Sequence, residues 1–398
     1  MAFKVEKTKE VTFESVESMM TYIEQEKKNT SRISIGGLLT EGATFQNDES
    51  FGKDDYKLKF NMPALDSLCR QLSLYTPMLE QLDNPGLASD VLNDRLFSKG
   101  LKDKLNKTEL VFDEVSKTVL GIVSQSYVGY SNEDFLTDIC SCLSSDKQTS
   151  LIPSFGEFEF VKSYSINTHL NLRLLNKSKK GVIYGKGGVD EDVSYLGLQV
   201  SNAMAGGKAL RMAYFVERLV CANGLVLPAG GTETKLIHAG KRENFNKRLS
   251  EKMHDVVGSL GNVKKTIEQL GALDFKPEKL AATVDLAILF GIIPGKDLKQ
   301  LGTEDFSETF KDWLTRFDKE ERERQRNIKL VTSIPELIGG EHSDNVFKSP
   351  YRDTATMFDF INVFTEEARK YQPKQRLQIE QDTGKLADFI AKNKKVFA

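Results

Sequence analysis

The stretch FGEFEFVKSYSINTHLNLRLLN, residues 155–176, carries the strongest evidence for the fold class. Its aromatic and aliphatic side chains are distributed among polar neighbours, which is typical of strands with one face in a core. SYLGLQVSN, residues 194–202, has the same character, and we expect it to pair with the first stretch. The centre of the chain therefore predicts a mixed or antiparallel sheet.

Toward the amino terminus the sequence predicts further strands with helices inserted between them. Residues 31–45 and 53–62 have the composition of two strands. A helical pattern starts at Pro63, since proline is favoured in the first turn of a helix. Residues 87–105 show a second helical pattern. These inserted helices indicate an α+β protein.

A helix with a clear start signal follows residues 108–124, which have the pattern of two strands. Ser131 or Asn132 can cap this helix, because a short polar side chain satisfies the first free backbone N–H groups. Glu133 and Asp134 would then lie in the first turn, where the helix dipole favours negative charge. We therefore expect a helix beginning at Glu133.

Beyond residue 240 the sequence becomes helical throughout, with Gly, Pro and Asp between the helices. Residues 1–30 have the pattern of a polar leader with one short amphipathic helix. We predict three parts: this leader, an α+β core over 31–240, and a helical region over 241–398.

Composition excludes several classes of protein. The chain has 398 residues, of which 39% are hydrophobic and 28% charged, enough to build sizeable cores. No stretch has the roughly 20 consecutive apolar residues that a bilayer span needs. Four scattered cysteines are too few for a disulfide framework. We expect a cytoplasmic protein without a membrane segment.

No pattern of residues predicts catalysis or a bound cofactor. MAGGKAL (204–210) lacks the hydroxyl that a phosphate loop places after its lysine, and YGKGG (184–188) is half a dinucleotide fingerprint. The four histidines are isolated, so no metal site is expected. Cys221 stands in an apolar context that favours a buried, inert thiol. We predict no catalytic residue, no metal and no cofactor.

The charge is unevenly distributed along the chain. Residues 1–150 hold 17 basic and 24 acidic side chains, whereas residues 151–250 hold 14 basic and 8 acidic ones, a net charge of +6 within a chain of −2. A basic centre is expected if one surface binds a polyanion. Chance clustering of charges on a solvated face is the alternative, and the sequence leaves both open.

The basic centre also contains aromatic residues, and single-stranded nucleic acid is bound by such a mixture. Cations contact phosphates and rings stack on bases. Burial of the aromatic residues in a core is the alternative. The predicted binding residues are Lys177, Lys179, Lys180, Tyr184, Lys186, Lys208, Arg211, Arg218, Lys241 and Arg242. For Arg218 a structural salt bridge to an internal carboxylate is an equally good interpretation.

Two motifs carry a resemblance to a known family. The first is VLGIVSQSYVGYSNEDFL (119–136) and the second is LGLQVSNAMAGGKALRMAYFVERLVCANGLVLP (196–228). Together they resemble phage- and plasmid-borne proteins that carry the domain of unknown function 932. MFDFINVFTEEARKY (357–371) is similar to the terminal helix of that family. The matching positions are Ser124, Tyr127, Asn132, Phe135, Asn202, Gly206, Ala209, Leu210, Arg218, Leu219, Val220, Cys221, Asn223, Gly224, Asn362, Thr365, Glu366 and Gly384.

The resemblance implies a protein of a mobile element in a bacterial cytoplasm and supplies no reaction. Our leading hypothesis is a phage or plasmid protein, not an enzyme, that binds single-stranded nucleic acid and acts in annealing, replication or recombination. A homo-oligomer is part of this hypothesis. A protein that binds or inhibits phage or host proteins is one alternative. An enzyme acting on nucleic acid or nucleotides, with an unrecognised site, is another.

Overall fold

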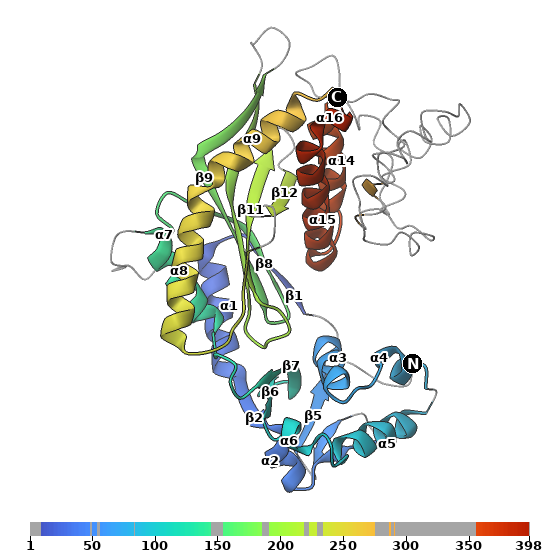
Figure 1. Ribbon diagram of the computed structural model, residues 1–398. Coiled ribbons are helices and arrows are strands. Elements are labelled where there is room, and N and C mark those ends of the chain that lie inside the picture. The colour runs from blue at the N-terminus through green and yellow to red at the C-terminus, as the bar shows by residue number, and fades with distance from the viewer. Residues whose placement is uncertain are drawn as a thin grey trace, which may run out of the picture.

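The computed structural model describes residues 9–274 and 356–397, with residues 286, 287 and 290. The gaps within the first range are residues 48–49, 54–55, 83, 145–153, 185–190, 219–222 and 229–233. Figure 1 shows two β-sheets, one above the other, with helices around each. This confirms the predicted α+β class. None of the helices in the described ranges has the length and hydropathy of a bilayer span.

The larger sheet is antiparallel and has the strand order β1-β8-β9-β10-β11-β12, with β13 also pairing β11. The stretch 155–176 forms β8 and the first half of β9, and 194–202 pairs with β9 as predicted, with Gln199 opposite Arg173. The bounds are β1 Glu10–Phe13, β8 Glu159–Ile166, β9 His169–Tyr184, β10 Glu191–Ala203, β11 Leu210–Arg218, β12 Asn223–Pro228 and β13 Thr234–Leu236.

Helices cover both faces of the larger sheet. On one face Leu172, Leu198 and Met212 pack with the apolar sides of α1, α7, α8 and α9. On the other face lies α15, where Glu380 forms a buried ion pair with Arg173 of β9. The bounds are α1 Val16–Asn29, α7 Asn132–Leu143, α8 Arg242–Gly258, α9 Leu260–Gly271, α14 Met357–Ala368, α15 Pro373–Lys392 and α16 Lys394–Phe397.

The smaller sheet is mixed and has the order β2-β6-β7-β5-β4-β3, in which β5 and β7 run parallel. Phe45, Phe51 and Phe60 form the aromatic centre of its own core. The bounds are β2 Thr30–Ser34, β3 Thr44–Phe45, β4 Phe51–Lys53, β5 Tyr56–Phe60, β6 Thr108–Asp113, β7 Thr118–Ser124, α2 Ile35–Thr40, α3 Met62–Gln71, α4 Thr76–Glu80, α5 Pro85–Leu96 and α6 Lys102–Leu105.

The first residues of α7 and α2 show how far local sequence determines where a helix begins. Ser131 caps α7, with its side chain accepting from Asp134 N and the Asp134 carboxylate accepting from Ser131 N, so the cap prediction is confirmed. The strand predicted over 31–45 is wrong in its middle. Ser34 caps a short helix there, α2, because its hydroxyl accepts from Gly37 N. In a segment of only six residues, the alternation of apolar and polar side chains did not distinguish a strand from a helix.

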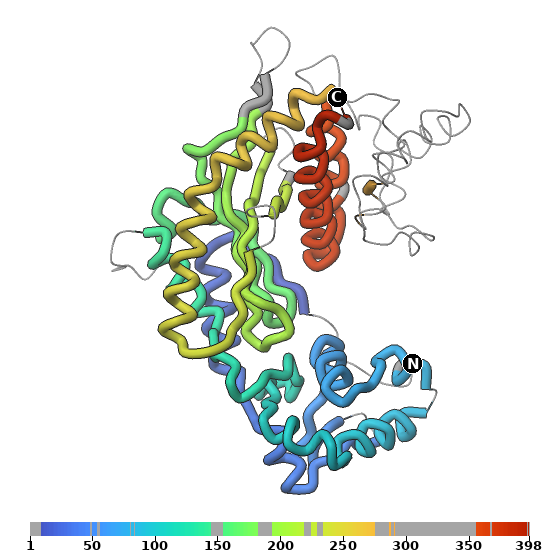
Figure 2. The backbone as a smooth tube through the Cα atoms, in the orientation of Figure 1, coloured from blue at the N-terminus to red at the C-terminus, as the bar shows by residue number. Residues whose placement is uncertain are grey.

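The chain crosses twice between the sheets. It contributes β1 to the larger sheet, passes through α1 to the smaller sheet, and returns to the larger one through α7 (Figure 2). Within residues 1–30 the expected amphipathic helix is present as α1, which buries Met19 and Ile23. The predicted part boundaries at residues 30 and 240 stay predictions.

A close contact joins the two sheets. A Cβ at Gly121 of β7 would overlap the carbonyl oxygen of Ala205, in the loop after β10. Val111, Val123 and Ala205 form a small apolar cluster at this point. The absence of a side chain at Gly121 is therefore what lets the smaller sheet approach the end of the larger one.

Candidate functional site

A cavity of about 390 Å³ lies between the two sheets. The smaller sheet supplies one wall, through Met62–Arg70 of α3 and Leu120–Ile122 of β7. The larger sheet supplies the other walls through the β8–β9 turn, the β10–β11 loop and the start of α15. The segments are distant in sequence, so the cavity exists only because the two sheets pack together.

Four cationic side chains line this cavity, which we call the cationic cavity. They are Arg70, Lys208, Arg211 and Lys374, and Asp66 is the one carboxylate among its described lining residues. Burial, together with the positive charges of Lys208 and Arg211, lowers the pKa of nearby His169 to about 4. His169 is therefore neutral at pH 7, and the positive charge of the cavity lining comes from the four cations.

The loop that carries Lys208 depends on two glycines. Gly206 and Gly207 have φ values of 80° and 79°, in the left-handed region that side chains disfavour. A Cβ at Gly206 would also lie 2.8 Å from Val123 Cγ1. The loop connects β10 to β11 with no following helix, so its geometry is that of a hairpin. It is not a phosphate loop, as the sequence predicts.

The structure separates the other predicted cations from this cavity. Lys177, Lys179 and Lys180 are exposed along β9, and Lys177 forms an ion pair of 2.5 Å with Glu159. Lys180 is 11 residues from His169 along the same strand, roughly 36 Å at 3.3 Å per residue. Tyr184 is the last residue of β9, and Lys186 lies outside the described residues. Among the described residues, the structure therefore does not place Lys177, Lys179 and Lys180 at the cationic cavity.

Arg218, Lys241 and Arg242 lie in two further places. Arg218 is 5% exposed and its Nη2 lies 2.8 Å from Asp359 Oδ1, so of its two interpretations the structure shows the internal salt bridge. Lys241 is exposed and precedes α8, and Arg242 forms a 2.9 Å ion pair with Asp134. Among the aromatics, Tyr214 and Phe215 are buried in the core.

Arg70 and Lys374 are cationic-cavity residues that the sequence did not reveal. Arg70 lies in the last turn of α3, and Lys374 lies in the first turn of α15. Neither position has a local signal, because an exposed cation on a helix usually marks only a solvated face. Their contribution follows from the packing of α3 and α15 around the end of the larger sheet.

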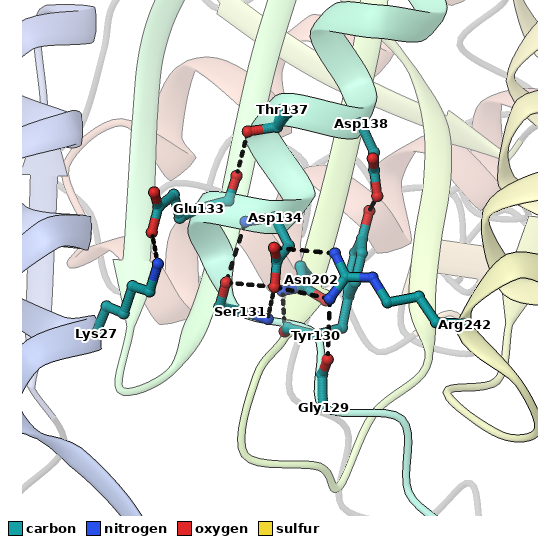
Figure 3. A network of polar contacts seen from close by, with 10 residues as sticks. All are labelled: Lys27, Gly129, Tyr130, Ser131, Glu133, Asp134, Thr137, Asp138, Asn202 and Arg242. Atoms are coloured by element: carbon teal, nitrogen blue, oxygen red, sulfur yellow. Dashed lines mark hydrogen bonds and ion pairs between the residues drawn. The ribbon is translucent and has the colours of Figure 1, made fainter.

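A polar network fixes the segment before α7 (Figure 3). Arg242 Nη2 lies 2.9 Å from Asp134 Oδ1, and Ser131 donates to the same carboxylate. Although burial opposes it, these hydrogen bonds lower the pKa of Asp134. Lys27 pairs with Glu133, the residue next to Asp134 in the first turn of α7. The network holds α1, α7 and α8 together and leaves Arg242 engaged in an internal contact.

A second set of hydrogen bonds runs through the buried interior beside α7. Asn132 Nδ2 donates to Glu26 Oε2 (2.6 Å), and Asn202 Nδ2 donates to Asn132 Oδ1 (2.9 Å). The Asn202 amide nitrogen donates to Asn132, so its oxygen Oδ1 points toward His238. His238 Nε2 therefore donates to Asn202 Oδ1 across 3.0 Å. The Tyr127 hydroxyl lies 3.2 Å from the other ring nitrogen, Nδ1. Burial lowers the pKa of His238 to about 4, so the ring is neutral.

Comparison with protein-family models identifies residues 119–393 as a Domain of unknown function (DUF932). The chain belongs to the DUF932 family. No curated protein and no solved structure matches it. The matched range includes β7 to α15 and thus three of the four cations of the cationic cavity. Arg70 precedes it.

The family motif is largely structural in this DUF932 protein. Tyr127, Asn132 and Asn202 belong to the buried hydrogen-bond set, and Arg218 is in the Asp359 salt bridge. A Cβ at Gly384 of α15 would overlap the carbonyl oxygen of Val226 in β12. Among the described residues no group of three or more His, Cys, Asp and Glu side chains could hold a metal ion. The motif therefore positions elements around the cavity.

Proposed function

We propose that this DUF932 protein binds single-stranded nucleic acid and holds its phosphates in the cationic cavity. The observation that carries the proposal is the convergence of Arg70, Lys208, Arg211 and Lys374 around one cavity, with Asp66 as the one carboxylate among its described lining residues. Phosphate contacts of this kind supply most of the affinity of non-specific nucleic-acid binding. They require no catalytic group.

The size and charge of the cavity support an unpaired strand. A volume of about 390 Å³ lies in the range of small-ligand pockets, which accommodate a nucleotide but not a duplex. Arg211 has a planar guanidinium group suited to phosphate oxygens, and Lys208, exposed on the hairpin loop, adds a compact ammonium charge.

The test is a salt titration of binding to a fluorescent dT12 oligonucleotide, followed by anisotropy. Four phosphate contacts on a single strand predict a log–log slope of about −2.8. The double variant Lys208→Glu with Arg211→Glu should weaken binding and reduce the slope. Lys99→Glu with Lys102→Glu is the matched control, because these exposed lysines line neither the cationic cavity nor its neighbour. The absence of binding at low salt would refute the proposal.

The three predicted lysines of β9 belong to the same proposal as a second contact region. Lys179 and Lys180 on β9, with Lys177, would extend the path of a longer strand. The variant Lys179→Glu with Lys180→Glu should then weaken binding to a 30-nucleotide probe, and weaken dT12 binding less, because a shorter strand bound in the cationic cavity reaches β9 less often. If this variant bound the 30-nucleotide probe as tightly as the wild-type protein does, the lysines of β9 would not be part of the binding surface.

Annealing during replication or recombination and a homo-oligomeric state are the finer parts of the proposal. An annealing assay with two complementary labelled strands tests the first, and light scattering of the purified chain tests the second. A protein that binds dT12 but leaves the annealing rate unchanged would be a protecting protein instead.

A further inference from the structure

A second cavity of about 400 Å³ adjoins the cationic cavity. The two share Leu120, Asn167 and Thr168 as lining residues, so the β8–β9 turn stands between them. Asn167 is held there by two hydrogen bonds with Lys9, in which each residue's backbone N–H is a donor. We call this second cavity the acceptor cavity. A ligand bound in the cationic cavity has this second space directly beside it.

The acceptor cavity has a different chemistry from its neighbour. Glu26 and Asp113 are its carboxylates, and α1 adds the amide side chains of Gln25 and Asn29. Lys9 is the one cation among its described lining residues, and its ammonium group lies 4.9 Å from the centre of the Tyr22 ring. Two carboxylates repel phosphate but accept hydrogen bonds from N–H donors.

Both carboxylates are oriented by the protein. Asp113 Oδ1 accepts from the backbone N–H groups of Val115 (3.0 Å) and Ser116 (2.6 Å) in the β6–β7 turn. Glu26 accepts from Asn132 through Oε2. In each case these hydrogen bonds within the described part of the chain use one oxygen of the carboxylate. The other oxygen remains as an acceptor with a fixed direction.

We infer that the acceptor cavity binds a nucleobase of the strand whose phosphate occupies the cationic cavity, and that it selects bases with N–H donors on their Watson–Crick edge. This inference rests on the proposed function. Guanine is the best match, because its ring N–H and amino group are adjacent donors. Thymine is the worst match, since its one N–H lies between two carbonyl oxygens that the carboxylates repel.

The experiment compares dT12 with the same oligonucleotide carrying one central dG, by anisotropy competition at pH 8. Burial raises the pKa of Glu26 to about 7, so the carboxylate is ionised at this pH. The wild-type protein should bind the dG probe about tenfold more tightly, as expected for one well-placed pair of hydrogen bonds. The Glu26→Gln variant should lose most of this ratio.

Two further variants complete the design. Glu24→Gln, on the same helix but lining neither cavity, is the matched control and should keep the ratio. Asp113→Asn should also reduce it, and its amide oxygen can still accept from the turn, so this variant should fold as well.

Equal affinity of the wild-type protein for both probes would overturn this inference and leave the proposed function standing. The inference would also fail if Glu24→Gln lost the ratio as fully as Glu26→Gln. No binding of either probe at low salt would overturn the proposed function instead.

Discussion

The variant Arg218→Met tests whether this residue of the basic centre is structural. Arg218 and Asp359 are each 5% exposed, and their contact of 2.8 Å joins β11 to the first turn of α14. Asp359 Oδ2 also accepts from the Thr356 N–H and hydroxyl, both at 2.8 Å. Removing the guanidinium group leaves this carboxylate buried without its cationic partner on β11. We expect a loss of about 3–5 kcal/mol in the free energy of unfolding.

A double-mutant cycle isolates the ion pair from the change in packing. Arg218→Met with Asp359→Asn removes both charges, while the amide oxygen that the second change introduces can still accept from Thr356. Replacing a buried pair by neutral groups is often close to neutral, so the double variant should be at least about 2 kcal/mol more stable than Arg218→Met alone. Urea denaturation followed by circular dichroism measures both free energies.

The same variant also separates the two interpretations of Arg218. Because the side chain is buried and lines neither cavity, folded Arg218→Met should bind dT12 with the wild-type salt slope. A stability loss below about 1 kcal/mol, combined with a slope reduced by about 0.7, would mean that Arg218 contacts a phosphate. That result would refute the structural assignment.

Three further predictions follow from close packing and from buried titratable groups. Gly121→Ala should lower the free energy of unfolding by about 2–3 kcal/mol, because the added Cβ meets the Ala205 backbone. Gly207→Ala should lower it by about 1 kcal/mol, because a Cβ there has open space and only the positive φ is unfavourable. Equal urea midpoints for the two variants would contradict this prediction. Burial raises the Glu26 pKa from 4.5 to about 7, so ionisation of this carboxyl lowers the free energy of unfolding of the wild-type protein as pH rises through that window. Glu26→Gln should therefore have a free energy of unfolding on the order of 2 kcal/mol above that of the wild type at pH 8, and nearly the same one at pH 4. Urea denaturation at the two pH values measures the difference. Because burial lowers the His238 pKa from 6.5 to about 4, its protonation destabilises the fold as pH falls through that window, and His238→Gln should be less acid-sensitive than wild type by thermal melts at pH 7 and 4.5; identical acid sensitivity would argue against a neutral, buried ring.

The predictions that succeeded depend on neighbouring residues. The Ser131 cap of α7 and the pairing of 155–176 with 194–202 follow from short spacings and alternation. The family was identified from the same kind of evidence, because motifs such as RLVCANG are contiguous strings. The strand predicted across α2 shows the limit: six residues that alternate weakly fit a helix as well once Ser34 caps it.

The placement of charge could not be predicted in this way. Segment counts predicted a cationic centre, but Arg218 is neutralised by Asp359, far along the chain, and Lys177 of β9 pairs with Glu159 on the neighbouring strand β8. Arg70 and Lys374 join Lys208 only because α3 and α15 pack around the end of the larger sheet. Local sequence is enough to predict helix caps, strands and the fold class, since the patterns that indicate them span only a few residues. Which charges meet, and whether they are buried, depends on contacts between distant segments, and those exist only in the folded chain.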